Sequence, residues 1–265
     1  MSQPQKSYYM QDLTAREVAS YLERSDLAII PVGCHEAHGA LMPMGTDTFI
    51  AETVALKLAE RIDGLISPFP NCYYPGATKG LPGTFAMPAE VAEGYLEMIV
   101  HELIRNKFRR IMIMQWHGVD YLHWQLVRDL YDETGVPVAY FSLLRMPVVQ
   151  RLKVELLDSR GECLETAVLA ASLRILGKEH LLDTSIMADN QVVQDRVEEP
   201  ALTKIGQAGG GIGHYYDHES QHMPFRKNPD FESGLIILEA MVDSLATASE
   251  GLREYINIID QRSSH

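Results

Sequence analysis

The chain has 265 residues, of which 46% are hydrophobic and 22% charged, so it can bury a core without disulfides. Its 23 basic and 36 acidic side chains give a net charge of −13. This balance argues against a general nucleic-acid binder, because such a protein presents a basic face to the phosphates. It leaves open a small substrate bound in one pocket.

The cysteines and the amino-terminal residues indicate where the protein works. Cys34, Cys72 and Cys163 form an odd and sparse set, which predicts a reduced, cytoplasmic protein without a disulfide framework. Residues 1–12 are polar and lack the apolar stretch of a signal peptide. No stretch approaches the ~18 uncharged apolar residues of a membrane span, so we expect no membrane partner.

Short apolar runs alternate along the chain with longer segments in which apolar residues recur every three or four positions. Thr14 and Glu17 form the capping-box pattern of a helix start, and Gly177 is typical of a helix end. The short runs predict strands over residues 27–33, 65–69, 110–115 and 136–143. The longer segments predict helices over residues 14–24, 47–62, 88–106, 121–134, 165–176 and 232–259.

Continuous apolar strands that alternate with helices predict an α/β fold, with a mostly parallel central sheet covered on both faces. No repeat or flexible linker divides the chain, so we expect one domain over residues 1–265. The segment from about residue 189 to about residue 230 lacks a regular spacing of apolar residues. A segment of this kind in a compact domain is usually functional. We therefore expect an active-site loop there. The glycine run at 209–213 follows no strand, which argues against a dinucleotide-binding fingerprint.

Potential metal ligands follow two of the predicted strands. Glu36 and His38 come after the first strand, Asp47 begins the next helix, and His117 comes after the third strand. Ligands bind at the carboxyl ends of parallel strands, so these four side chains can converge. Each alone has a simpler explanation, such as a helix cap for Asp47 or a hydrogen-bonded loop histidine. Together, imidazole and carboxylate suit Zn²⁺, Mn²⁺ or Fe²⁺.

The residues around these ligands form a recognisable series of motifs. PVGCHEAHG (31–39) and LMPMGTD (41–47) resemble the P-x-G-x-x-E-x-H-G and T-D elements of creatininase-type amidohydrolases. LPGT (81–84) resembles their F-P-G-T segment, and QWHGVD (115–120) resembles their N-x-H-G-G-N segment. ETA (165–167) resembles their E-T-S segment. The chain is thus similar to the creatininase family over most of its length.

This resemblance implies a three-layer α/β/α fold, two divalent metal ions per chain, and a homo-oligomer, commonly a hexamer. Glu36 and His117 would hold one ion and His38 the other, with Asp47 bridging the two. Two such ions can activate a shared water near neutral pH and polarise the carbonyl of a substrate.

The sequence departs from the family pattern at several places. Creatininase has a carboxylate where this chain has Val119, so the second ion lacks one ligand. We expect Glu165 to replace it, both as ligand and as catalytic group, with Asp120 as the next candidate. The family's histidine before E-T-S is absent here, where Ser159 stands, and the loop at 75–80 lacks the usual histidine. These differences argue against creatinine itself as the substrate.

Three histidines in the irregular segment offer a replacement for the missing proton-transfer group. His214, His218 and His222 recur every four residues, which would align them on one face of a helix. The alternative is a polar surface loop. We expect at least one of them to reach the active site, and favour His214 as the catalytic residue because the glycines before it allow close approach.

We further expect Trp116, Thr78 and His218 to contact the substrate. The favoured function is binuclear metal-dependent hydrolysis of an amide or related carbonyl in a small, cyclic metabolite. One alternative is hydrolytic carbon–carbon ring opening of an oxidised cyclitol of the diketo-inositol type. Another is a metal-free binding or structural protein on the same fold.

Overall fold

The computed structural model describes residues 7–119, 121–182, 199–208, 211–222 and 229–263. The strands are β1 (Leu27–Val32), β2 (Leu65–Ile66), β3 (Arg110–Gln115) and β4 (Val138–Ser142). They form one sheet in the order β2-β1-β3-β4, in which every pair of neighbours is parallel. The predicted parallel sheet is therefore confirmed.

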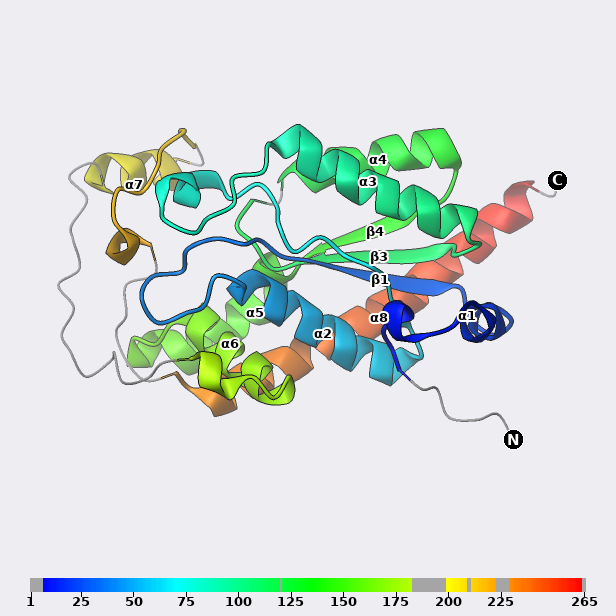
Figure 1. Cartoon of the computed structure of the whole chain (residues 1–265), viewed down its shortest axis with the longest axis horizontal. Coiled ribbons are helices and arrows are strands. Elements are labelled where there is room, and N and C mark those ends of the chain that lie inside the picture. Colours follow the sequence, from blue (N-terminus) through cyan, green and yellow to red (C-terminus); the bar gives the residue numbers. More distant parts are fainter. Residues whose placement is uncertain (1–6, 120, 183–198, 209–210, 223–228, 264–265) are drawn as a thin grey trace.

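Helices cover both faces of this sheet and produce three layers (Figure 1). The helices are α1 (Ala15–Leu22), α2 (Thr46–Ile62), α3 (Ala89–Arg105), α4 (Tyr121–Thr134), α5 (Pro147–Leu152), α6 (Leu164–Ile175), α7 (Glu199–Gln207) and α8 (Phe231–Ser263). On one face α3 contacts α4, and on the other α2, α6 and α8 contact one another while α5 contacts α8. The predicted α/β/α arrangement is thus confirmed.

The two cores explain the continuous apolar strands. Successive side chains of a strand point to opposite faces of the sheet. Leu27 and Ile29 of β1 enter the core that contains residues of α2, α6 and α8. Ala28 and Ile30 enter the core that contains residues of α3 and α4, and all four side chains are fully buried. A strand covered on both sides needs apolar residues at every position.

Local sequence signals set most helix ends to within one or two residues. The Thr14 side chain accepts a hydrogen bond from the Glu17 backbone, while the Glu17 carboxylate accepts one from the Thr14 backbone. This confirms the capping box at the start of α1. α6 ends at Ile175, and Gly177 adopts a φ of +68° shortly after it. A left-handed residue after a helix is the usual role of glycine there.

Some elements differ from the prediction. β2 is shorter than the predicted strand at 65–69, because Pro68 has no backbone N–H to donate to a neighbouring strand. α5, the π-helical turn at Lys153–Leu157 and α7 have no counterpart in the sequence prediction. α7 lies within the segment 189–230 that we expected to be irregular. Residues 189–198, 209–210 and 223–228 of that segment lie outside the described residues.

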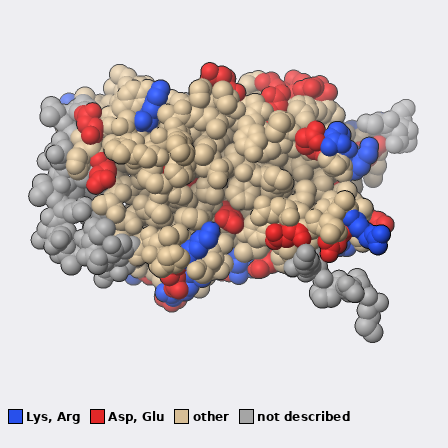
Figure 2. Space-filling model, viewed as in Figure 1, with Lys and Arg blue, Asp and Glu red and all other residues tan. Residues whose placement is uncertain are grey.

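The strands all point toward the end of the molecule where α7 lies, and α1 lies at the opposite end (Figure 1). None of the helices in the described part of the chain is both long and apolar enough to span a bilayer. On the face seen in Figure 2, Lys and Arg are interspersed with Asp and Glu. This face therefore offers no continuous basic surface to a phosphate backbone.

Candidate metal centre

The candidate ligands meet at the carboxyl ends of β1 and β3. Glu36 and His38 lie in the segment after β1, and His117 lies two residues after β3. Asp47 is the second residue of α2, which starts close to the end of β1. Gly33 permits this approach, because a Cβ atom there would lie 2.4 Å from the backbone nitrogen of Thr48. The strand ends thus bring distant ligands together, as the sequence predicts.

One imidazole faces two carboxylates at the first half of the site. Nδ1 of His117 lies 3.0 Å from Oε1 of Glu36 and 3.1 Å from Oδ2 of Asp47. Its Nε2 donates a hydrogen bond of 2.9 Å to the carbonyl of Tyr74. This contact keeps a proton on Nε2, so Nδ1 is the nitrogen that can take either a proton or a metal ion.

A second imidazole repeats this arrangement on the other side of Asp47. Nε2 of His38 lies 3.3 Å from Oδ1 of Asp47 and 3.8 Å from Oε1 of Glu165. Its Nδ1 lies 3.0 Å from the carbonyl oxygen of Glu36, which assigns the proton to Nδ1. Nε2 therefore faces the carboxylates as a potential ligand.

These two groups share one carboxylate and fit a pair of divalent cations. Cys34, Glu36, Asp47 and His117 offer ligand atoms within 4.8 Å of one another, and so do His38, Asp47 and Glu165. Oδ2 of Asp47 is buried and faces Nδ1 of His117 at 3.1 Å. A buried carboxylate needs a positively charged partner, which a protonated imidazole or a metal cation provides.

The charged groups of the site act strongly on one another. Burial alone would lower the pKa of His38, but attraction to Asp47, Glu165 and Glu36 outweighs it and raises this pKa to about 10. Burial likewise opposes the rise of the His117 pKa, which hydrogen bonds to Asp47 and Glu36 hold well above its ordinary value. A metal ion that bound these two nitrogens would displace their protons.

The two carboxylates on either side of His38 respond differently. Burial would raise the pKa of Asp47, but the two histidines hold it below its ordinary value. Burial is the largest cause that raises the pKa of Glu165, which His38 and a hydrogen bond from Trp116 only partly offset. Asp47 is therefore the stronger permanent anion of the pair.

Two residues that we expect to contact the substrate also support the candidate ligands. The Thr78 side chain is buried and donates a hydrogen bond to Oε2 of Glu36. The indole of Trp116 is fully buried, and its Nε1 donates a hydrogen bond of 2.8 Å to Oε1 of Glu165. Both side chains are thus placed to orient a carboxylate.

Cys34 completes the first group as a buried thiol. Its side chain is fully buried, and its Sγ lies 3.7 Å from the carbonyl oxygen of Tyr73. Burial, followed by the negative charges of Glu36 and Asp47, raises the pKa of this thiol. The neutral thiol therefore packs beside the carboxylates, as expected of a small buried residue.

The histidine segment reaches the site through one member that we did not favour. His222 offers a ring nitrogen within 4.8 Å of ligand atoms of Glu36 and His38. His218 is exposed, and the ring of His214 packs edge-on against Tyr216. Residues 211–218 form no helix, so the expected shared helix face is wrong. Burial and the nearby His38 lower the pKa of His222 to about 4.

The structure also shows where the residues lie at which the chain departs from the family motifs. Val119 is half-buried, and Asp120 lies outside the described residues. Ser159 is exposed, and the neighbouring Arg160 donates hydrogen bonds to Asp230 at the start of α8. The turn around Ser159 is thus occupied in holding α8.

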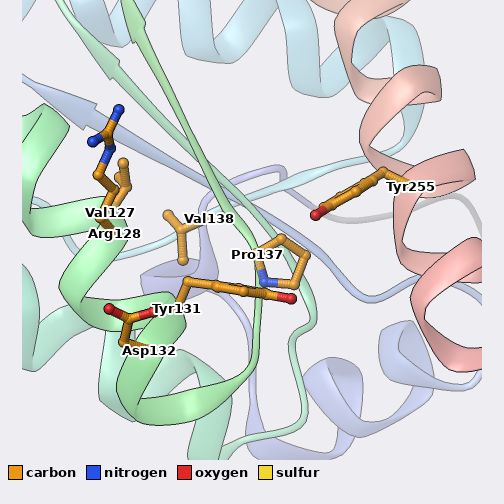
Figure 3. A pocket seen from close by; sticks show the side chains of 7 residues that line it. All are labelled: Val127, Arg128, Tyr131, Asp132, Pro137, Val138 and Tyr255. Carbon is orange, nitrogen blue, oxygen red and sulfur yellow. The ribbon is translucent and has the colours of Figure 1, made fainter. Parts of the chain in front are cut away.

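A separate cavity of about 250 Å³ lies where β4 begins (Figure 3). None of the candidate ligands lines it. The candidate metal centre is therefore independent of this cavity. The residues that line the cavity come from α4, β4, α8 and the segment before β4: Val127, Arg128, Tyr131, Asp132, Pro137, Val138 and Tyr255.

Comparison with known proteins identifies the class to which this fold and site belong. The creatininase family, described as creatinine amidohydrolase, matches residues 11–248. The chain therefore belongs to the creatininase family.

Two curated relatives illustrate the range of this family. The chain is 33% identical over 118 residues to 3-dehydro-scyllo-inosose hydrolase of Thermotoga maritima, covering 43% of this chain and 37% of the relative. It is 28% identical over 167 residues to creatinine amidohydrolase of Pseudomonas putida, covering 57% of this chain and 64% of the relative. The chain thus matches less than two thirds of either relative.

A solved structure named "Creatininase Mn" shares the fold with a TM-score of 0.67 at 23% identity. The match covers 92% of this chain and 97% of that chain. At this identity the likeness establishes the fold, while the chemistry of the site depends on the residues of this chain.

Proposed function

We propose that the protein is a binuclear metal-dependent hydrolase that acts on an amide or related carbonyl of a small, cyclic metabolite. The observation that carries this proposal is the position of Asp47, whose two carboxylate oxygens face His38 on one side and His117 on the other. A carboxylate shared in this way is the usual bridge of a two-metal hydrolytic site.

The side chains of this chain divide between the two ions. Glu36 and His117 would hold one ion, His38 and Glu165 the other, and Asp47 both. The donor set of imidazole and carboxylate suits Zn²⁺, Mn²⁺ or Fe²⁺. When bound, such ions activate water and polarise a carbonyl group. Thr78 and Trp116 keep Glu36 and Glu165 in orientation through their hydrogen bonds.

Elemental analysis of the purified, untagged protein tests the metal assignment. We expect close to two equivalents of divalent metal in the wild type and a loss of both in Asp47→Asn, since the neutral amide keeps only one of the two oxygens that the ions would share. Glu60→Gln is the matched control, because Glu60 is exposed on the same helix. An unchanged metal content in Asp47→Asn would contradict the bridging role. A metal-free wild type would favour a binding protein on the same fold.

A second candidate reaction is hydrolytic carbon–carbon ring opening of an oxidised cyclitol. Two observations favour it: the similarity to an enzyme named as an inosose hydrolase, and the absence of a histidine at Ser159. Ring opening of a diketone requires a polarised ketone and a carbanion leaving group, so it does not need a proton donor placed for an amine.

Parallel assays with the metal-loaded protein distinguish the two reactions. One set contains creatinine and other cyclic amides, and the other contains diketo-inositols. Conversion of a cyclic amide to a ring-opened product that carries both a new carboxylate and a new amino or guanidino group supports the first reaction. Turnover of the diketones alone supports the second. Asp47→Asn is the control in both sets, since it should be inactive in either case.

We also propose a homo-oligomer that works on a small molecule without nucleic acid or membrane. The described surface leaves large apolar side chains open, and a second copy would cover them. Sedimentation at micromolar concentration tests this assembly, and a monomer would contradict it. Examples of these side chains, with 62%, 57% and 49% of their surface exposed, are Phe85, Trp124 and Tyr255.

A further inference from the structure

The segment 211–222 is attached to the turn that supports the candidate metal centre. The backbone N–H of Tyr216 donates a hydrogen bond of 2.9 Å to the carbonyl of Ala77. Ala77 precedes Thr78, whose hydroxyl binds Glu36. The Gln221 side chain accepts hydrogen bonds of 2.9 and 3.2 Å from the backbones of Asp217 and His218. These contacts fix where the end of the segment lies.

These contacts place His222 beside the candidate metal centre. Its ring lies 5.4 Å from the ring of His38 and 5.1 Å from the ring of Tyr216, measured between centroids. A ring nitrogen of His222 lies within 4.8 Å of ligand atoms of both Glu36 and His38. Its Nε2 is buried and has no hydrogen-bond partner among the described residues.

A buried nitrogen without a partner, on a ring that lies beside two ligand atoms, has a direct physical explanation. Burying a polar group without a hydrogen bond costs free energy, and a hydrophobic side chain would pack against Tyr216 without that cost. Neutral imidazole is a common ligand for Zn²⁺ and Mn²⁺ and binds through one ring nitrogen. A cation beside His38 would provide the partner that the nitrogen lacks.

We propose that His222 is an additional ligand, which binds through a ring nitrogen the ion that His38 holds. The proposal rests on the metal site put forward under Proposed function. It assigns to segment 211–222 a role in metal retention and compensates for Val119, which stands where the family pattern has a carboxylate. The second ion would then have His38, Asp47, Glu165 and His222 as protein ligands.

Metal affinity tests this proposal without any measurement of activity. Protein stripped with a chelator is titrated with Zn²⁺ against a chromogenic chelator, for the wild type, His222→Ala and His218→Ala. His218 is the matched control, because it is exposed in the same segment. We expect His222→Ala to weaken one of the two binding steps by at least about tenfold, as loss of metal-site groups typically does. His218→Ala should bind as the wild type does.

Two further measurements separate loss of a ligand from loss of structure. The Co²⁺ form should show a changed visible absorption band in His222→Ala, since the ion loses a nitrogen ligand. Added imidazole should restore the band and the affinity, because it can occupy the space left by the side chain. Circular dichroism and the thermal midpoint of the metal-free variant should match the wild type, which shows that the fold is intact.

The outcomes are distinct. If the wild type binds two ions and His222→Ala binds both within threefold of it, the role of His222 is overturned while the binuclear site stands. If the wild type binds no divalent ion, the proposed function itself fails. A weakened affinity that imidazole does not restore, together with an unchanged Co²⁺ spectrum, would assign His222 to packing and overturn its role as a ligand.

Discussion

Nε1 of Trp116 donates a hydrogen bond of 2.8 Å to Oε1 of Glu165, the same oxygen that lies 3.8 Å from Nε2 of His38. The indole thereby connects the end of β3 to the start of α6. A carboxylate on its own can rotate away from a ligand position, whereas one held by a buried N–H cannot do so freely. Trp116 is therefore placed to orient a candidate ligand.

Trp116→Phe should keep most of the packing and remove only this hydrogen bond. We expect the affinity of one metal site to fall by about 10–100-fold, as is usual for loss of a group that orients a ligand. The other site should keep its affinity, because the hydrogen bond from the indole goes to Glu165 and not to Glu36 or His117. Stepwise Zn²⁺ titration measures both sites. Trp124→Phe is the control, since Trp124 is exposed on α4, and equal behaviour of the two variants would refute this role.

Glu165→Gln tests the ligand itself rather than its support. The substitution keeps the shape and the contact with Trp116 but removes the negative charge. We expect occupancy near one metal equivalent, with the site of Glu36 and His117 still filled. Elemental analysis after dialysis gives the number. Two equivalents together with normal turnover would make Glu165 an ordinary acid at the start of a helix.

The metal-free protein should lose stability as the pH rises. The pKa of His38 is raised from 6.5 to about 10, so protonation of His38 stabilises the folded state. That contribution is fully present below the unfolded value of 6.5 and is lost as the pH rises through about 10. The lowered pKa of Asp47 acts in the opposite direction and matters only in acid, below the ordinary value of 3.8.

Urea unfolding at pH 7 and pH 9.5, with and without a chelator, measures this effect. We expect the free energy of unfolding to fall with pH in the chelated protein and to fall less in the metal-loaded protein, because ions replace the protons. A chelated protein that is equally stable at both pH values would count against the raised pKa.

Much of the site could be predicted because the ligands lie next to strand ends. A parallel sheet brings the residues after β1 and β3 to one edge, so Glu36 and His117 meet although they are distant in sequence. The orientation of Trp116 could not be predicted, because a tryptophan after a strand can point either into the core or into a pocket. Its partner, Glu165, is visible only once α6 has been placed.

The sequence also could not show which of the three histidines reaches the site. A spacing of four residues aligns side chains only in a helix, and residues 211–218 are not helical. The hydrogen bond between Tyr216 and Ala77 fixes the position of the segment instead. This contact joins residues that are far apart in sequence, so no local sequence pattern predicts it. His222, rather than His214, therefore reaches His38.

Gly33→Ala should lower both the stability of the fold and the affinity for metal ions. A Cβ atom at this position would lie 2.4 Å from the backbone N and Cα atoms of Thr48, so the start of α2 must move. We expect a loss of about 1–3 kcal/mol in the free energy of unfolding, typical of overpacking. Asp47 precedes Thr48, so both metal sites should weaken together.

Gly94→Ala is the matched control, because Gly94 lies in α3 and a Cβ atom there meets nothing within 4 Å. This change should stabilise the protein by about 0.5–1 kcal/mol, since alanine loses less backbone entropy than glycine in a helix. Urea unfolding and Zn²⁺ titration of both variants provide the comparison. If Gly33→Ala lost stability yet bound both ions with wild-type affinity, the start of α2 would not be what positions Asp47, and the shared carboxylate would have to be held by its two histidines alone.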